Sequence, residues 1–172
     1  IGHAGFMAVG AYLSAIATVK LALPFEVALV FGMIAAGLLG LLIGLPTLRL
    51  KGDYLAIATL GLGEIIRVAI LNINYVGGAS GFMGIARETN STYAFMLALF
   101  TIFVVKNLIN SAPGRACLAI RENEIAAETM GIDTTKYKVL AFTVGAAFAG
   151  LAGGLFSHYY YIAHPASFTF MK

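Results

Sequence analysis

Long apolar runs are the feature that most restricts what this chain can fold into. A helix needs about 20 mostly apolar residues to cross the hydrocarbon core of a bilayer. Five runs of that order lie at 5–23, 25–45, 55–73, 93–109 and 139–162. The second run holds no charge from Val27 to Leu48 and is bounded by Pro24 and Pro46, which interrupt helices. The chain is therefore expected to form about five membrane-spanning helices.

The composition supports lipid as the surrounding solvent. Apolar residues make up 60% of the chain and charged residues only 11%, whereas about a quarter of a soluble domain is charged. The Lys and Arg residues are scattered between apolar runs, so the net charge of +3 gives no basis for nucleic-acid binding. The predicted fold class is all-α integral membrane, a polytopic helix bundle that forms a single transmembrane domain over residues 1–172. It is expected to be a fragment, because it starts without Met and residues 163–171 read like a connection to another span.

Positive charge indicates which connections face the cytoplasm. The turn at 46–54 and the polar stretch at 110–138 hold the basic residues Arg49, Lys51, Arg115, Arg121, Lys136 and Lys138. The stretch at 74–92 has only Arg87. Cytoplasmic loops carry an excess of Lys and Arg, so the first two connections are predicted to be cytoplasmic and the third to lie outside.

Small residues recur every four positions in two of the runs. One series is Gly32, Ala36, Gly40 and Gly44, and the other is Ala146, Gly150 and Gly154. This spacing places each series on one helix face, and small residues let membrane helices approach closely. Tight helix packing is favoured over a pore lining for both faces.

The third run holds two opposite charges inside the predicted membrane. Glu64 and Arg67 are three residues apart, so they share a helix face on which they can pair. Ionisable residues within a membrane are costly and by default suggest function. Two interpretations stay open: a structural ion pair, and part of a translocation path together with Gly61 and Gly63.

A glycine-rich stretch at 75–84 lies on the predicted outer side. It contains Gly77, Gly78 and Gly81, which are too many glycines for a rigid helix. We expect a flexible or sharply turning loop, with an outer gate as the alternative. No Lys-Ser or Lys-Thr follows, so the stretch is not a phosphate-binding loop.

The three histidines give no basis for a metal site. His3, His158 and His164 lie far apart, with no carboxylate at ligand spacing. We expect ordinary residues of the membrane interface and no bound metal.

The stretch at 116–131 reads as an amphipathic helix on the cytoplasmic side. One face holds Ala116, Ala119, Ile120, Ala126, Ala127 and Met130, and the other holds Arg121, Glu124 and Glu128. Gly131 follows, as a glycine that ends a helix does. Ile125 projects from the charged face, which favours an anchor for a partner protein. A helix lying on the membrane surface is the alternative.

Residues 124–131 resemble the coupling loop of ABC importer permeases. The pattern of that loop is Glu-Ala-Ala, three residues and then Gly, and it is matched by Ala126, Ala127 and Gly131. Ile125 stands at the position of the glutamate, and Thr143 and Val144 replace the later Leu-Pro of the pattern. Three further stretches, at 2–6, 48–54 and 61–67, are similar to permeases for branched-chain amino acids. The resemblance runs along nearly the whole chain.

The resemblance implies a permease subunit without catalytic residues or cofactor of its own, in the inner membrane of a bacterium. A second permease subunit would complete the pore, ATP-binding subunits holding ATP and Mg would dock on the coupling helix within 116–135, and an extracytoplasmic solute-binding protein would deliver the substrate. In the docked state Ile125 would enter a groove of the ATP-binding subunit. Arg121, Glu124 and Glu128 would form a polar rim.

Two other transport functions share these features. An ABC permease for another solute, such as a sugar, would have the same architecture. An ion-gradient-driven secondary transporter would use Glu64 as a titrating group. An intramembrane enzyme is disfavoured, because no paired carboxylates, Gly-x-Ser-x-Gly elbow or His-x-x-x-His pair occurs at the depth of a span.

Overall fold

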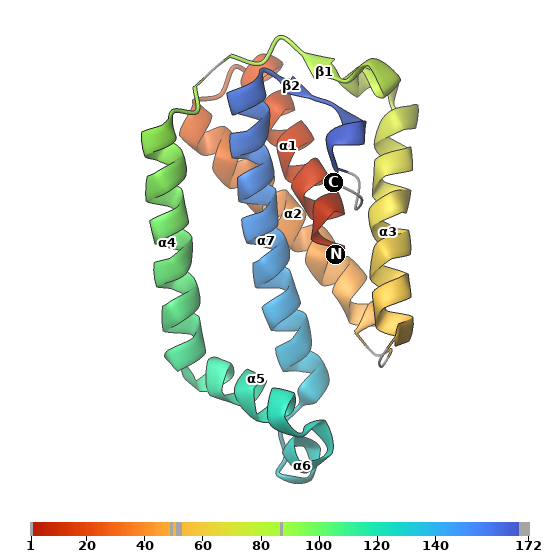
Figure 1. The fold of residues 1–172 in the computed structure, drawn as a ribbon, viewed down its shortest axis with the longest axis vertical. Helices are drawn as coiled ribbons and strands as arrows, with labels where there is room; N and C mark the ends of the chain where they lie inside the picture. The colour runs from red at the N-terminus through yellow and green to blue at the C-terminus, as the bar shows by residue number, and fades with distance from the viewer. Residues whose placement is uncertain (1, 49, 51–52, 87, 169–172) are drawn as a thin grey trace.

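Seven α-helices make up most of the residues that the computed structural model describes, which are 2–48, 50, 53–86 and 88–168 (Figure 1). The helices are α1 (His3–Val19), α2 (Phe25–Thr47), α3 (Asp53–Asn72), α4 (Ser91–Asn110), α5 (Ala112–Glu122), α6 (Glu124–Thr129) and α7 (Thr134–Tyr160). Shorter elements are the 3-10 turns η1 (Asn74–Val76), η2 (Gly78–Ser80) and η3 (Pro165–Phe168) and the strands β1 (Phe82–Met83) and β2 (Ile162–Ala163).

Four of the described helices, α2, α3, α4 and α7, are long and apolar enough to cross a membrane. The remaining predicted run, 5–23, corresponds to α1, an apolar helix of 17 residues that is shorter than the other four. The predicted all-α membrane bundle is confirmed. α7 begins five residues before the predicted run, because the side chain of Asp133 caps it by accepting a hydrogen bond from the Lys136 amide at 3.0 Å.

Helices α1, α2 and α7 form the tightly packed centre of the bundle. The two predicted small-residue faces pack on each other: a Cβ placed on Gly40 would lie 2.5 Å from the Cβ of Ala146, and one on Gly150 would overlap the Cβ of Ala36. Gly10 of α1 meets Gly150 at the same crossing, backbone against backbone. The packing interpretation of both small-residue series is confirmed.

Helices α3 and α4 stand to either side of this centre (Figure 1). None of the described residues of α4 is buried, and most of its large apolar side chains are exposed. Exposed apolar side chains are expected on a helix that faces lipid, because lipid tails are themselves apolar and do not drive such side chains into the protein interior.

The glycine-rich stretch forms a cap over one end of the bundle. Strand β1 pairs with β2 in antiparallel fashion, with Phe82 opposite Ala163. The Tyr12 hydroxyl of α1 donates to the Ala163 carbonyl at 2.7 Å. Gly81 has φ +79°, and a Cβ on it would lie 2.9 Å from the same carbonyl oxygen. The stretch is therefore a sequence of sharp turns held on the bundle.

Candidate coupling site

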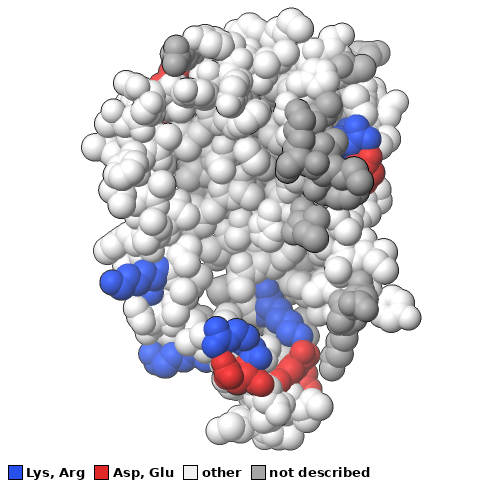
Figure 2. Space-filling view, viewed as in Figure 1, with Lys and Arg blue, Asp and Glu red and all other residues white. Residues whose placement is uncertain are grey.

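Charged side chains gather at one end of the molecule, over α5, α6 and the start of α7 (Figure 2). The end of α2 and the start of α3 lie toward this end, and the described residues of the stretch at 74–92 lie at the other (Figure 1). This is the arrangement of connections that the distribution of Lys and Arg predicted. Arg49, Lys51 and Arg87, on which that prediction partly rested, lie outside the described residues.

The predicted amphipathic helix is two helices, and the prediction of one continuous helix is wrong. α5 ends at Glu122 and α6 begins at Glu124, with Asn123 between them in an extended conformation (φ −158°, ψ 108°). The Asn123 side-chain oxygen accepts from the Ala126 amide at 3.0 Å. Asn competes with the helical backbone for such bonds and so favours a new helix start over continuation.

α6 presents its apolar residues differently from the predicted pattern. Ala127 is buried, with 3% of its surface exposed, and Ile125 is 72% exposed, as expected from its place among the charges. The helical period predicts Met130 on the buried face, but its side chain is exposed (83%). The reason is that α6 ends at Thr129, so Met130 no longer follows that period.

Two hydrogen-bonded pairs fasten α6 to the start of α7. Lys138 Nζ lies 2.7 Å from Glu124 Oε2, and Thr134 Oγ1 donates to Glu128 Oε1 at 2.8 Å. Glu124 and Glu128 therefore bond within the chain, which the predicted role of a polar rim did not foresee. Arg121 does extend into solvent, where it pairs with Glu122, and both side chains are 72% exposed.

Gly131 ends this segment as predicted. Its φ is +84°, and its amide donates to the Glu128 carbonyl at 3.0 Å. The next amide, of Ile132, donates to the Ala127 carbonyl at 3.0 Å. This left-handed turn folds the chain back from α6 into α7.

Cys117 lies on α5 against α7, and its Sγ is 3.6 Å from the Tyr137 carbonyl oxygen. Partial burial raises the pKa of the thiol above its ordinary value. The thiol is a packing contact between the two helices.

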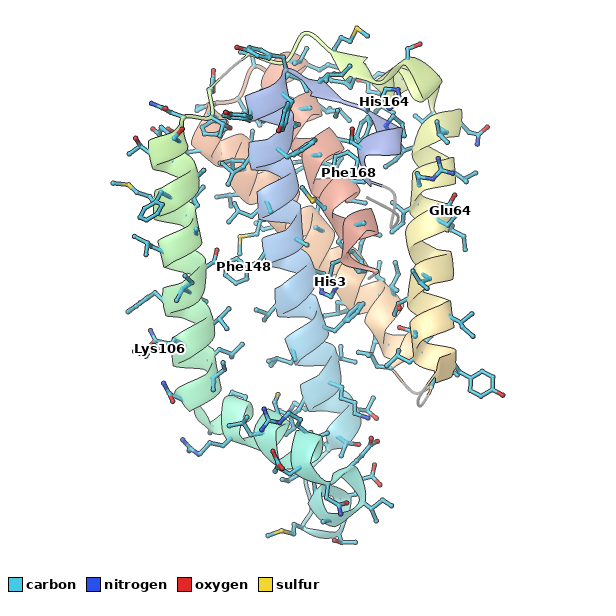
Figure 3. The ribbon with its side chains drawn as sticks, in the orientation of Figure 1. His3, Glu64, Lys106, Phe148, His164 and Phe168 are labelled. Atoms are coloured by element: carbon cyan, nitrogen blue, oxygen red, sulfur yellow. The ribbon has the colours of Figure 1, made fainter. Side chains whose placement is uncertain are left out.

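The intramembrane pair on α3 forms as predicted. Arg67 Nε donates to both carboxylate oxygens of Glu64, at 2.9 and 3.0 Å, and Arg67 Nη2 donates to Oε1 as well. Glu64 lies on the outer half of α3, with 44% of its side chain exposed and 25% for Arg67 (Figure 3). One side of the pair is therefore open to whatever packs on α3.

The two glycines near this pair have different surroundings. Gly63 lies at the crossing of α3 with α1, where a Cβ on Gly5 would come within 2.9 Å of the Gly63 Cα. A methyl group added to Gly61 would meet no atom of the described residues within 4 Å. Glu64 borders one small cavity together with Gly63 and a separate surface hollow together with Gly61.

His158 lies in the interior of the protein, where the sequence suggested only an ordinary residue of the membrane interface. It is fully buried on α7, where its Nδ1 lies 2.8 Å from the Gly154 carbonyl oxygen and its Nε2 lies 3.1 Å from Thr18 Oγ1 of α1. The labelled His3 and His164 lie well apart in Figure 3. Among the residues that the structure describes, no group of three or more His, Cys, Asp and Glu could hold a metal ion.

The residues that sequence reasoning missed are the partners of the two carboxylates on α6. Lys138 entered the prediction only as a topological charge, and Thr134 did not enter it. A signal was present: Glu124 and Glu128 are four residues apart, as are Thr134 and Lys138, and only five residues separate the two pairs. Such spacing places each pair on one helix face.

The chain is similar to proteins of known function along its whole length. Residues 1–171 match the model of a family described as branched-chain amino acid transport system, permease component. The chain is 37% identical to the high-affinity branched-chain amino acid transport system permease protein LivM of Escherichia coli and 35% identical to that of Salmonella typhimurium. Each alignment covers 100% of this chain and 49% of the relative, so the chain spans about half the length of these relatives.

A shorter similarity extends to a second permease. Over 74 residues the chain is 40% identical to the permease protein LivH of Escherichia coli, which covers 43% of this chain and 22% of that protein. No solved structure matches the chain. With four long apolar helices in the described residues, these matches identify a multi-pass membrane protein.

Proposed function

We propose that this chain, which belongs to the family of permease components of branched-chain amino acid transport systems, is part of an ATP-driven importer subunit for such amino acids. The subunit would lie in the inner membrane of a bacterium and pair with a second permease subunit. It would hydrolyse no ATP itself and would receive its substrate from a solute-binding protein. ATP and Mg would be held by separate ATP-binding subunits.

One observation carries the docking of the ATP-binding subunit: a large apolar side chain at the charged end of the molecule is turned to solvent. Ile125 is 72% exposed on α6, and α6 is fixed by hydrogen bonds to α7. A rigidly held apolar residue loses little conformational entropy on binding, so it suits a small hydrophobic groove in a partner. Arg121 provides an exposed charge nearby for the rim of the contact.

The experiment replaces Ile125 in the full-length subunit and measures both assembly and uptake. Ile125→Asp should abolish co-purification of the ATP-binding subunit and uptake together, because a carboxylate is costly to bury in an apolar groove. Ile125→Leu is the matched control and should keep both. Assembly and uptake that are unchanged in Ile125→Asp would refute docking at this residue.

The substrate is tested separately from the docking. Radiolabelled leucine should bind to the assembled transporter or to its solute-binding partner, with an excess of unlabelled sugar giving no competition. Leucine that fails to bind while a sugar binds would favour a permease for another solute. Uptake that follows an ion gradient in the absence of ATP would favour a secondary transporter.

The Glu64–Arg67 pair is the candidate for a place on the translocation path. Its open side faces away from the described bundle, so a second permease subunit packed on α3 would complete any path there. Amino acids carry one positive and one negative group, and an ion pair that opens offers a partner for each. Glu64→Gln and Arg67→Gln test this role if uptake is measured at matched amounts of assembled transporter, and full uptake in both variants would remove the pair from the path.

A further inference from the structure

We infer that Glu124 and Glu128 are positioning residues that clamp α6 onto α7, so that displacement of α6 is passed to α7 and through it to α1 and α2. This inference rests on the proposed function of α6 as the docking element for an ATP-binding subunit. It assigns to the two carboxylates a role within the chain in place of a contact with the partner.

The geometry of the clamp fixes both the position and the direction of α6. Glu124 pairs with Lys138 and Glu128 with Thr134, so the earlier residue on α6 bonds to the later one on α7. The two bonds therefore join α6 to the first two turns of α7. Two bonds one helical turn apart oppose rotation as well as translation, which a single bond would not do.

Shielding from water distinguishes the Glu124–Lys138 pair from the Arg121–Glu122 pair at the same end. The side chains of Lys138 and Glu124 are 26% and 28% exposed. Thr134 is 5% exposed, and its partner Glu128 is exposed. The Arg121 and Glu122 side chains are each 72% exposed. Exposed ion pairs contribute little to stability, and partial burial strengthens the interaction. The Glu124–Lys138 pair is thus suited to keep α6 attached to α7 when a partner displaces α6.

The backbone supports the same connection. Only residues 130–133 separate α6 from α7, and two amides in this turn donate to α6 carbonyls, as described for Gly131 and Ile132. Asp133 then caps α7. On its other side α6 joins α5 through Asn123, whose amide donates to the Ala119 carbonyl at 3.1 Å and whose carbonyl accepts from the Ala127 amide at 3.0 Å. α6 is thus joined by hydrogen bonds to α7 as well as to α5.

α7 is also the helix that can carry a displacement into the bundle. It packs against α2 along the small-residue faces that include Ala146 and Gly150, and against α1 where Gly10 meets Gly150. These contacts are between backbones and methyl groups, which cannot deform by rotating a side chain. A shift of α7 must be accommodated by α1 and α2.

The test compares transport per ATP hydrolysed in the complete transporter reconstituted in liposomes. The double variant Glu124→Ala, Glu128→Ala removes both acceptors of the clamp; it should keep the ATP-binding subunit and hydrolyse ATP within about twofold of wild type, and its uptake per ATP should fall at least fivefold. Glu122→Ala is the matched control, since Glu122 is an exposed carboxylate at the same end of the molecule that pairs with Arg121 in solvent, and it should keep wild-type coupling. An unchanged uptake per ATP in the double variant overturns the inference.

Loss of the ATP-binding subunit from the double variant also overturns it, because the carboxylates would then contact the partner directly. If wild-type chain fails to retain that subunit, the proposed function itself is wrong, and the two failures are thereby distinguished. A charge exchange identifies the partner of Glu124: Glu124→Lys alone should lose coupling, and Glu124→Lys with Lys138→Glu should regain at least half of it. No recovery in the exchanged pair removes Lys138 from the clamp.

Discussion

Gly150 offers the sharpest test of how the central helices are held together. A methyl group at this position would overlap the Cβ of Ala36 and lie 2.9 Å from the Gly32 carbonyl oxygen. Both obstacles belong to the backbone or to a Cβ, so α2 and α7 would have to move apart. Overpacking of this kind costs about 1–3 kcal/mol, and we expect the upper end of that range because nothing can rotate away. Alanine regains about 1 kcal/mol over glycine in a helix interior. The expected net loss for Gly150→Ala is therefore about 2 kcal/mol, taking both contributions together.

The matched control is the same substitution at a glycine with free space around it. Gly61 lies on α3 with no described atom within 4 Å of an added methyl group, so Gly61→Ala should be neutral or stabilising by up to about 1 kcal/mol. Unfolding in detergent micelles with increasing sodium dodecyl sulfate, followed by circular dichroism, compares the two variants with wild type. A Gly150→Ala protein that unfolds at the wild-type midpoint, or both variants shifting alike, would refute the account of close helix packing.

Three further predictions use other features of the structure. Glu64→Gln and Arg67→Gln should each lower the unfolding midpoint more than the double variant does, because each single change leaves one charge unpaired in the membrane; a double variant worse than both would contradict this. Gly131→Ala should cost about 1 kcal/mol in stability, because its φ of +84° is strained for a residue with a Cβ, and Gly131→Asn should cost less; equal midpoints for all three proteins would argue against it. Maleimide labelling of Cys117 should require higher pH than labelling of glutathione, because a raised pKa leaves less thiolate at a given pH; labelling at equal or lower pH would show that the thiol is not shielded.

The features that the sequence predicted well are those that the bilayer dictates. In lipid, helices associate through small residues that allow close approach, so a four-residue spacing of glycine and alanine is enough to find the α2–α7 contact. The arrangement of the connections was also predictable, because Lys and Arg gather in the connections that face the cytoplasm, however the helices pack. The pairing of Glu64 with Arg67 needed only their spacing on one helix.

The features that the sequence did not predict depend on contacts with other elements. Helical periodicity does not show whether Asn123 lies inside one helix or precedes the start of a new one. It also does not show that α6 ends at Thr129, which leaves Met130 exposed. His158 is buried because α1 supplies the Thr18 hydroxyl as its partner. When that partner is unknown, the sequence does not show whether a polar residue near the end of an apolar run is buried or lies at the membrane interface.

The clamp also indicates how a displacement of α6 would have to travel to reach Glu64. It would pass from α7 to α1 and then to α3, which touches α1 where Gly5 meets Gly63. Side chains of α3 also pack on α1 here: the Cδ1 of Ile66 would lie 3.2 Å from a Cβ on Gly5, and Ile70 shares a buried cluster with Ala8 of α1. Because close-packed side chains transmit a displacement, a movement of α1 delivered by α7 would reach the helix that carries the ion pair.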